Sequence, residues 1–448
     1  MKSFQRATIV LLLLTLSWGC IRRSEVSETV TRVKRRPNIL LISIDALGAR
    51  HLGCYGAERN TSPFLDELAR DGVLFQNAFV NTHGTPPSHT TMLSGLYQET
   101  HRVAWEDAGR FDVIPEGVPL LPELLQLKGY RTIGVTDGGY VSRQLGFARG
   151  FDEFDDDGGG IRSGMEKVVA SVERLHDGSG PLFVFLHTYE VHSPYDPPEE
   201  YATMFGEFSS DFRPTSENLL EHVHSALDTL TVNDRAKILA FYQAEIRYTD
   251  DVLREFFERI RDLGFLADAI VIITSDHGEE FGEHGGLLHK SHVYEELIRV
   301  PLIISAPFLP SGVIEESMSS IVQITPSVLQ WIGESRPEIM EGEPLRIEAA
   351  PAEEDAVFGQ YSSALYFIRT PRWKLIENSA PFKLELYDLD ADPGELENVA
   401  DANPDLTRKL FHRIRRWKAE RRPVVDRPHG VELTPEEIKQ LEALGYLR

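Results

Sequence analysis

Residues 38–45 read Asn-Ile-Leu-Leu-Ile-Ser-Ile-Asp, a near-continuous apolar run that ends in a carboxylate. Such a run is typical of a parallel strand that is buried on both faces of a sheet. Similar short runs follow at 131–136, 182–186, 269–274 and 300–304. Helical patterns lie between them, at about 62–71, 88–95, 119–128, 161–176 and 233–263. This alternation of strands and helices predicts an α/β fold with a mainly parallel central sheet.

Polar side chains stand where several of these runs end. Asp45, Asp137 and His187 each follow one run, and the pair Asp276-His277 comes just after the run 269–274. In open α/β sheets, ligands bind outside the carboxyl ends of the strands. Single Asp or His residues after a strand are common turn formers. Four such endings in one chain indicate a shared site at one edge of the sheet.

Length and charge narrow the classes of function. A chain of 448 residues predicts one large domain with a smaller one. Its 42% hydrophobic and 26% charged residues are ordinary for a globular protein. The formal net charge of −24 argues against nucleic-acid binding, which requires a basic face. An anionic substrate would need a local cation, such as a metal ion, to approach so acidic a protein.

The N-terminus has the pattern of a targeting segment. A basic start precedes an apolar run at 7–16, which is too short, and too soon followed by arginines, for a membrane span. We therefore predict a signal peptide over 1–20. Cys20 follows a small residue and resembles the lipidated cysteine of bacterial lipoproteins, with simple secretion as the alternative. Residues 21–36 would be a tether, and the exported protein would be lipid-anchored, facing the periplasm or the cell exterior.

The character of the chain changes at about 334–355, which is rich in Glu, Pro and Ala. Beyond this segment, short antiparallel strands are predicted at 365–369, 373–377 and 383–387. A basic amphipathic helix follows at 403–421, and a capping box at 434–437 begins a last short helix. We therefore divide the chain into a catalytic domain at 37–345 and a smaller α+β subdomain at 346–448.

Residues 82–95 read Thr-His-Gly-Thr-Pro-Pro-Ser-His-Thr-Thr-Met-Leu-Ser-Gly and contain a candidate nucleophile. The prolines and Gly84 predict rigid, non-helical backbone, after which Ser88 would cap a helix. Thr85 would then lie just ahead of a helix N-terminus, where the helix dipole favours an anion. With help from a metal or a base, its hydroxyl could attack an anionic ester. An ordinary proline-rich turn is the alternative.

A metal site is the second candidate. Asp45, Asp276 and His277 offer two carboxylates and an imidazole, and the hydroxyl of Thr85 would be a fourth ligand. This mixture of oxygen and nitrogen suits Mn, Zn or Fe better than Ca, which prefers a cage of oxygens. The alternative is a set of unrelated residues at strand ends.

Further histidines and a lysine lie near these segments. His187 or His192 would serve as a general acid or oxyanion donor, although a buried structural histidine is an alternative that fits His187 better. The glycine-hinged loop 282–292 is dense in histidine, and its Lys290 would hold an anionic oxygen.

Several motifs together resemble the sulfatase family of the alkaline phosphatase superfamily. They are the segments 37–45, 52–56, 85–95, 151–153, 187–195, 275–279, 294–301, 386–395 and 444–447, in the family's order. The resemblance implies an alkaline-phosphatase-like fold and one divalent metal ion, Mn, Zn or Ca, on Asp45, Asp276 and His277. It makes Thr85 both nucleophile and fourth metal ligand. It also implies His192 and Lys290 as contacts to substrate or leaving group, with His89 and His289 nearby.

The sequence departs from this family at the nucleophile. Family sulfatases carry Cys or Ser at the position of Thr85, which is oxidised to formylglycine, with Pro and Arg two and four residues later. This chain has Pro87 and His89 there, and Cys54 lies in no such motif. Threonine cannot form that aldehyde. The set of Asp45, Thr85, Asp276 and His277 is closer to threonine-dependent phosphotransferases and phosphodiesterases of the same superfamily.

These observations predict a metal-dependent hydrolase or transferase of sulfate or phosphate esters with Thr85 as its nucleophile. Its substrate would be an anionic ester of a small molecule, a glycan or a lipid, and its membrane contact would be the lipid anchor. The alternative is a non-catalytic, sulfatase-like envelope lipoprotein that binds an anionic glycan or lipid.

Overall fold

The computed structural model describes residues 36–104, 111–289, 292–348, 350 and 352–443. Residues 36–448 form one compact unit. The predicted signal peptide, Cys20 and the tether up to residue 35 lie outside the described residues. Across the part of the chain that is described, no helix combines the length and the apolar character that a membrane crossing requires.

An eight-stranded sheet forms the centre of this unit, in the order β12-β2-β11-β8-β1-β7-β5-β6. Strand β1 (Asn38–Ile44) is buried along its whole length, as its apolar sequence predicts. It runs parallel to β7 (Leu182–Thr188) and to β8 (Ala269–Thr274). Ser43 of β1 pairs with His187 on one side and with Thr274 on the other, so the three strands end at the same edge.

The outer strands complete a mainly parallel sheet. On one side, β5 (Arg131–Val135) and β6 (Glu153–Asp155) continue in parallel. On the other side, β11 (Leu302–Ser305) is antiparallel to β8 and to β2 (Val73–Phe75), and β12 (Val313–Glu315) is parallel to β2. The predicted strand at 300–304 is confirmed as β11, which is antiparallel to both of its neighbours in a sheet that is otherwise mainly parallel.

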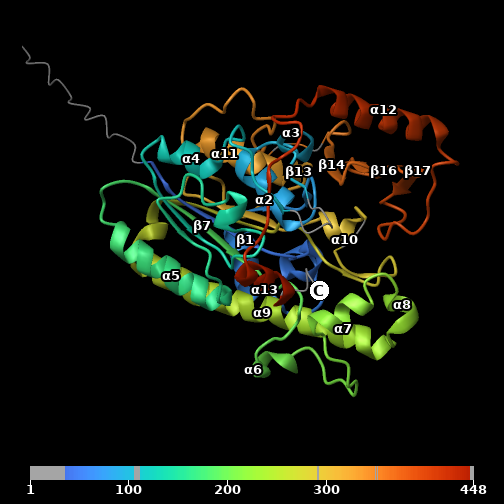
Figure 1. The fold of residues 1–448 in the computed structure, drawn as a ribbon, viewed down its shortest axis with the longest axis horizontal. Helices are drawn as coiled ribbons and strands as arrows, with labels where there is room; N and C mark the ends of the chain where they lie inside the picture. Colours follow the sequence, from blue (N-terminus) through green and yellow to red (C-terminus); the bar gives the residue numbers. More distant parts are fainter. Residues whose placement is uncertain (1–35, 105–110, 290–291, 349, 351, 444–448) are drawn as a thin grey trace, which may run out of the picture. The chain divides into compact units, whose positions relative to one another are not determined.

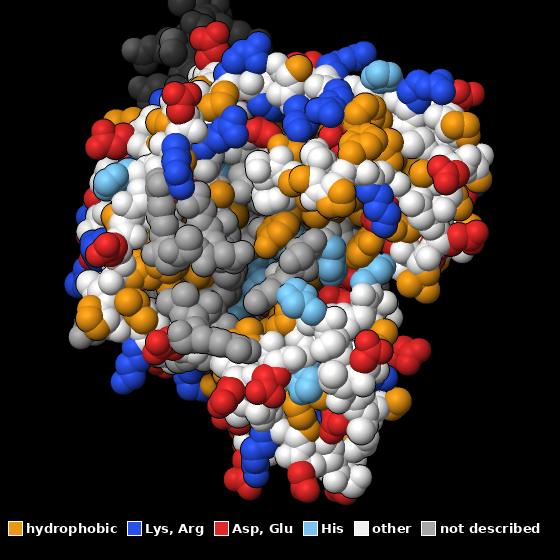
Figure 2. All heavy atoms as spheres, turned by 45° about the vertical axis from the view of Figure 1, so that its right-hand side comes forward, with side chains coloured by type: hydrophobic (Ala, Val, Ile, Leu, Met, Phe, Trp, Pro, Cys, Tyr) orange, Lys and Arg blue, Asp and Glu red, His pale blue; other side chains and the backbone are white. Residues whose placement is uncertain are grey.

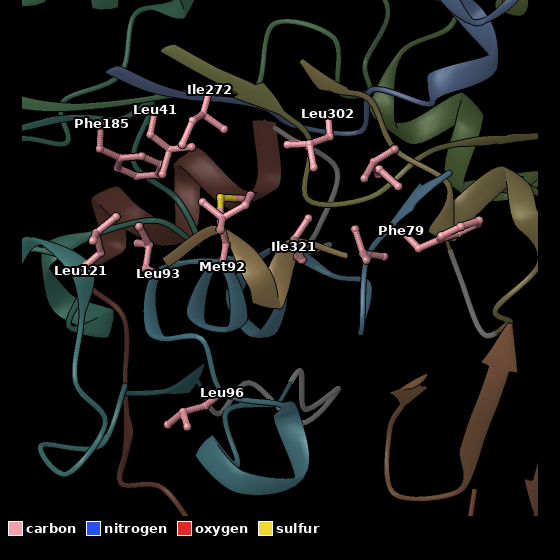
Figure 3. Packing of buried hydrophobic residues seen from close by; sticks show 14 of the residues in the cluster. Leu41, Phe79, Met92, Leu93, Leu96, Leu121, Phe185, Ile272, Leu302 and Ile321 are labelled. Atoms are coloured by element: carbon pink, nitrogen blue, oxygen red, sulfur yellow. The ribbon is translucent and has the colours of Figure 1, made fainter. Parts of the chain in front are cut away.

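Helices cover both faces of the sheet (Figure 1). Alternate residues of β1 divide between two cores: Ile39 and Leu41 belong to one, Leu40 and Ile42 to the other. The first core includes α2 (Thr85–Ser94), α4 (Leu121–Gln126) and α11 (Ile324–Trp331). The second includes α1 (Pro63–Asp71), α5 (Gly160–Leu175) and α9 (Val232–Asp262). Figure 3 shows Met92 and Leu93 of α2 packed beneath Leu41, Phe185 and Ile272 of the sheet.

Helix α2 begins three residues earlier than the sequence predicts. Gly84, with φ of 94°, is its N-cap, and Thr85 is its first residue. Pro86 and Pro87 fit the first turn because backbone N–H groups there have no partner within the helix. Ser88 is therefore a buried residue inside the helix rather than its cap, and its hydroxyl donates to the carbonyl oxygen of Asp276 (2.6 Å).

The C-terminal part holds a four-stranded antiparallel sheet. Its strands are β14 (Val357–Tyr361), β15 (Leu365–Arg369), β16 (Trp373–Ser379) and β17 (Phe382–Asp388). The last three confirm the predicted strands, and β14 was not predicted. Helix α12 (Pro404–Glu420) packs Leu410, Ile414 and Trp417 on this sheet. The domain boundary at 345/346 stays a prediction.

The remaining elements are short. The helices are α3 (Gln98–His101), α6 (Glu199–Ala202), α7 (Ser216–Glu221), α8 (Ala226–Thr229), α10 (Glu295–Ile298) and α13 (Pro435–Ala443). The strands are β3 (Ala78–Phe79), β4 (Phe111–Asp112), β9 (Glu280–Phe281), β10 (Leu287–Leu288), β13 (Ser319–Ser320) and β18 (Gly430–Val431).

Candidate active site

Three elements bring the predicted metal ligands and the predicted nucleophile together. Asp45 follows β1, Thr85 begins α2, and Asp276 and His277 follow β8. All four side chains are fully buried. The ligand atoms of Asp45, Asp276 and His277 lie within 4.8 Å of one another. The strand-end pattern in the sequence therefore corresponds to one cluster in space.

The distances in this cluster are short. The hydroxyl of Thr85 donates to Asp45 Oδ2 over 3.3 Å. His277 Nε2 lies 3.5 Å from Asp45 Oδ1 and 3.5 Å from Asp276 Oδ2. The other ring nitrogen of His277, Nδ1, is 2.9 Å from the carbonyl oxygen of Gly278, which can only accept. This contact places the proton on Nδ1 and turns the lone pair of Nε2 toward the two carboxylates.

The cluster fits a divalent metal ion. Asp45 Oδ1, Asp276 Oδ2 and His277 Nε2 are all buried, and none has a hydrogen-bond partner among the described residues. A buried polar atom without a partner costs about 1–3 kcal/mol, so three that converge on one point require an explanation. Two carboxylate oxygens and one imidazole nitrogen form a common ligand set for Mn or Zn.

The pKa values in the cluster are coupled. Burial and the neighbouring Asp276 raise the pKa of Asp45 well above its usual value. Burial also disfavours the Asp276 carboxylate, but nearby histidines, chiefly His277, hold its pKa below the usual range. Burial lowers the pKa of His277, and the two carboxylates overcome this effect and raise it. Two buried carboxylates this close favour a cation between them.

His89 supports the backbone of the candidate nucleophile. Its Nδ1 lies 2.9 Å from the carbonyl oxygen of Thr85, one helical turn earlier, and its Nε2 lies 2.9 Å from the hydroxyl of Ser43. Burial lowers the pKa of His89 to about 4. His187, near the end of β7, places Nε2 3.3 Å from Asp45 Oδ2. Burial lowers its pKa to about 4 as well. Both imidazoles are therefore neutral at pH 7.

His192 lies on the far side of the cluster, in the loop after β7. Its Nδ1 is 2.6 Å from the carbonyl oxygen of Ser193, which fixes the ring orientation. The ring centroid lies 6.5 Å from that of His277 and 4.9 Å from that of His289. Burial, with a contribution from His289, lowers the pKa of His192 to about 3. In the protein without substrate, its imidazole is neutral.

The structure adds a residue that the sequence reasoning did not single out, Glu279. Its Oε1 lies 2.8 Å from His289 Nδ1, and its Oε2 accepts a hydrogen bond from Tyr195 (2.8 Å). Burial raises the pKa of Glu279 to about 7. The His289 ring lies 4.2 Å from that of His277. Glu279 therefore holds His289 against the cluster, a role that its position three residues after Asp276 does not reveal.

A second missed residue, His83, reaches the site from the other side. It is 1% exposed and stacks on Tyr361 of β14, with ring centroids 4.2 Å apart. Burial and three histidines, first among them His277, lower its pKa well below the usual value. Since Tyr361 belongs to the C-terminal sheet, this sheet supports one wall of the site. Figure 2 shows histidine side chains gathered in a hollow of this face.

Lys290 lies outside the described residues, so its predicted contact to an anionic oxygen stays a prediction. The loop around it is held by two histidine–carboxylate pairs. His284 Nδ1 lies 2.6 Å from Glu296, and His292 Nε2 lies 2.9 Å from Glu280. Glu280, His292 and Glu296 also bring ligand atoms within 4.8 Å of one another. The carboxylate oxygens of Glu280 and Glu296 that lie near His292 already have histidine partners. In the cluster at Asp45, by contrast, the converging ligand atoms have no hydrogen-bond partner among the described residues.

Comparisons with known proteins agree with this geometry. The family described as Sulfatase matches residues 37–334, and the family described as N-sulphoglucosamine sulphohydrolase, C-terminal, matches residues 282–420. Arylsulfatase K of Mus musculus is 25% identical over 450 residues, which cover 86% of this chain and 80% of that protein.

Solved structures share the fold. One is a protein in complex with its substrate D-glucosamine-2-N,6-O-disulfate, at a TM-score of 0.68 and 22% identity, covering 86% of this chain and 98% of that one. Another is the phosphonate monoester hydrolase of Agrobacterium radiobacter, at a TM-score of 0.70 and 21% identity, covering 89% of this chain and all of that one, 100%. The alkaline-phosphatase-like α/β fold predicted from the sequence is confirmed.

Proposed function

Because the chain belongs to the sulfatase family and is a hydrolase of ester bonds, we propose that Thr85 is its nucleophile toward a sulfate or phosphate ester. One observation carries this proposal. The hydroxyl of Thr85, at the first position of α2, donates to Asp45 Oδ2 over 3.3 Å, so it lies against the cluster of Asp45, Asp276 and His277. This is the position at which family sulfatases carry Cys or Ser.

The reaction would proceed in two displacements. The Thr85 hydroxyl, which donates to Asp45 Oδ2, loses its proton in that direction as its oxygen attacks sulfur or phosphorus. A bond forms from Thr85 Oγ1 to that centre, and the bond to the alcohol oxygen breaks. Water then attacks the same centre and gives a proton to His192, which is neutral after the first step. The bond to Thr85 Oγ1 breaks, Thr85 regains its proton from Asp45, and sulfate or phosphate is released. An acceptor hydroxyl in place of water would make the enzyme a transferase.

The N-terminus of α2 assists through its dipole. The partial positive charge there stabilises the anionic ester oxygens beside Thr85. Pro86 and Pro87 have no N–H groups, so the helix dipole rather than a row of backbone donors provides this attraction. The two prolines also keep the first turn rigid, which holds Thr85 at one angle to the cluster.

One divalent metal ion would be held by Asp45, Asp276, His277 and the hydroxyl oxygen of Thr85. When bound, it would supply Lewis-acid stabilisation of the negative charge that develops on the ester oxygens. The imidazole favours Mn or Zn, with Ca as the alternative.

His192 would deliver a proton to the leaving oxygen. Its low pKa in the free protein makes it neutral, and a nearby anionic ester opposes this effect by favouring the imidazolium. The contact from Nδ1 to the carbonyl oxygen of Ser193 fixes the ring, and Nε2 would be the atom that donates to the leaving oxygen. Lys290 would hold an ester oxygen, and His89 would position Thr85 through its carbonyl oxygen.

The test is turnover of four ester classes: an aryl sulfate, a phosphate monoester, a phosphate diester and a phosphonate monoester. Thr85→Ala should lower kcat by roughly three orders of magnitude or more on the best of them. Thr85→Ser should keep measurable activity, and Thr90→Ala, a buried threonine of the same helix, is the matched control. A fully active Thr85→Ala enzyme would exclude this mechanism. No turnover of any class by the metal-loaded protein would favour the non-catalytic binding protein.

We also propose that Cys20 carries a lipid anchor on the cell envelope. Metabolic labelling with a radioactive fatty acid tests it, with Cys20→Ala as the control. Equal labelling of both forms would refute the anchor.

A further inference from the structure

A cavity of about 410 Å³ lies beside His192. Its lining includes five carboxylates, from Asp137, Asp157, Glu190, Asp196 and Glu245. It is separate from the cluster at Asp45, because neither Asp45 nor Asp276 lines it. Among the described residues, its lining includes no lysine or arginine.

The partners of the five carboxylates are neutral groups as far as the chain is described. In the described part of the chain, none of them lies within ion-pair distance of a lysine or arginine. Asp137 accepts from the N–H of Gly160 (2.9 Å) and from the hydroxyl of Thr188 (2.7 Å), which are neutral donors. The nearby Arg162 instead pairs with Glu255 at 2.8 Å. The cavity therefore gathers five carboxyl groups, and burial raises the pKa of two of them, Glu190 and Glu245, above the usual value.

Glu245 gives an independent sign of a missing ligand. Its side chain is 4% exposed, and its Oε1 accepts from the N–H of Asp196 at 2.7 Å. Its Oε2 is buried and has no hydrogen-bond partner among the described residues. Burial, with Glu190 adding to it, raises the pKa of Glu245 well above its usual value. An unpaired buried carboxylate oxygen is costly unless a ligand donates to it.

His192 connects the cavity to the reacting centre. It lines the cavity, and its ring lies 4.9 Å from that of His289 and 6.5 Å from that of His277. An ester centred on Thr85 that turns its leaving oxygen toward His192 would therefore direct its alcohol portion into the cavity.

From this arrangement we propose that the cavity binds a primary ammonium group on the alcohol portion of the ester. The inference rests on the proposed function, since it assigns a substrate class to the same site. A primary ammonium has three N–H donors for carboxylate oxygens, including Glu245 Oε2, and its positive charge favours the ionised form of these carboxyl groups. An N-sulfate at the same place would face five carboxylates. We therefore expect esters of free amines to be preferred to N-sulfated or neutral ones.

A matched pair of substrates tests this. The sulfate esters of 4-(2-aminoethyl)phenol and 4-propylphenol have similar size and differ in charge, and the corresponding phosphate esters form a second pair. The ammonium ester should show a kcat/KM higher by on the order of tenfold, as expected for one charge-assisted hydrogen bond. Glu245→Gln should lower this ratio toward one. Glu258→Gln, an exposed glutamate of the same helix, should leave the ratio unchanged.

The outcomes separate the two proposals. A wild-type ratio at or below one with both esters hydrolysed overturns the ammonium site and leaves the proposed function intact. A ratio that Glu245→Gln does not change overturns the assignment to this cavity. If no ester of either pair is hydrolysed, and the phosphate diester and the phosphonate are not hydrolysed either, the proposed function fails. Calorimetric binding of 4-(2-aminoethyl)phenol against 4-propylphenol then decides for the cavity alone. Calcium that binds there and is not displaced by the amine contradicts the proposal.

Discussion

Replacing Asp45 by Asn should have opposite effects on stability with and without metal. Asp45 and Asp276 present their ligand atoms within 4.8 Å of each other in a fully buried site. At that separation and an effective dielectric constant of about 20, two full charges repel by about 3 kcal/mol. Proton uptake by Asp45, whose pKa burial and Asp276 raise, relieves part of this repulsion. We therefore expect metal-free Asp45→Asn to be about 1–3 kcal/mol more stable than metal-free wild type.

Metal reverses the order. An ion at 1,000 times its Kd stabilises the wild type by about 4.1 kcal/mol, which exceeds the metal-free difference, because it binds the folded state alone. Asp45→Asn loses a charged ligand and should gain little from the same ion. Differential scanning calorimetry after chelation, and again after addition of Zn, Mn or Ca, measures both differences. Asp250→Asn is the control, because it removes a buried carboxyl group on α9 that is not part of the cluster. It should show the same metal response as the wild type.

One result would refute this reasoning. If Asp45→Asn lowers stability equally in the chelated and the metal-loaded protein, Asp45 is a structural hydrogen-bonding residue and the cluster is not a metal site.

Three further predictions concern other parts of the chain. Gly84→Ala forces a side chain onto a residue with φ of 94° and ψ of 132°, so it should cost about 1–3 kcal/mol of stability. Because it shifts Thr85, it should also lower kcat by roughly 10²-fold with metal content unchanged, which steady-state kinetics and metal analysis check. Burial raises the pKa of Asp250 to about 7, so the folded protein keeps a proton that the unfolded chain loses above about pH 4. The stability of the wild type relative to Asp250→Asn should therefore be greatest below about pH 4 and fall as the pH rises to 7; denaturant titrations measure it, and a flat difference contradicts it. Lys374 is 0% exposed and pairs with Glu295 at 3.3 Å and with Glu395 at 2.9 Å. Glu295 also pairs with Arg369, so Lys374→Met should destabilise by about 3–5 kcal/mol chiefly by leaving the buried Glu395 carboxylate without its cation; an unchanged denaturation midpoint contradicts it.

The central strands and the approach of Asp45, Asp276 and His277 to one another could be predicted from the sequence. The run 38–44 is apolar at almost every position because β1 is covered on both faces, and this makes it recognisable without any partner. Asp45 and Asp276 could be predicted to meet because parallel strands end at one edge, which is a property of the topology.

Other features were hidden for physical reasons. An apolar run has no direction, so the antiparallel pairing of β11 left no trace in residues 302–305. In β14, Gly359 interrupts the strand pattern; a Cβ there would lie 2.3 Å from the carbonyl oxygen of Asn81. The glycine permits the close approach that brings Tyr361 onto His83, so the feature that hides this strand also builds one wall of the site.

The contacts of Glu279 show a third limit. Its partners His289 and Tyr195 come from separate loops, and no periodicity relates the three positions. Side-chain pairs of this kind depend on how loops pack over the sheet, which the sequence pattern of each loop does not specify.

The most direct test of the central claim is to detect the covalent intermediate on Thr85. The metal-loaded enzyme is mixed with excess of its best ester, quenched in acid within the first turnover and digested for mass spectrometry. The account predicts one added sulfuryl or phosphoryl group on the peptide that contains Thr85, localised to its hydroxyl and absent from Thr85→Ala. An added group on another residue, or rapid single turnover with no added group on any peptide, would contradict it.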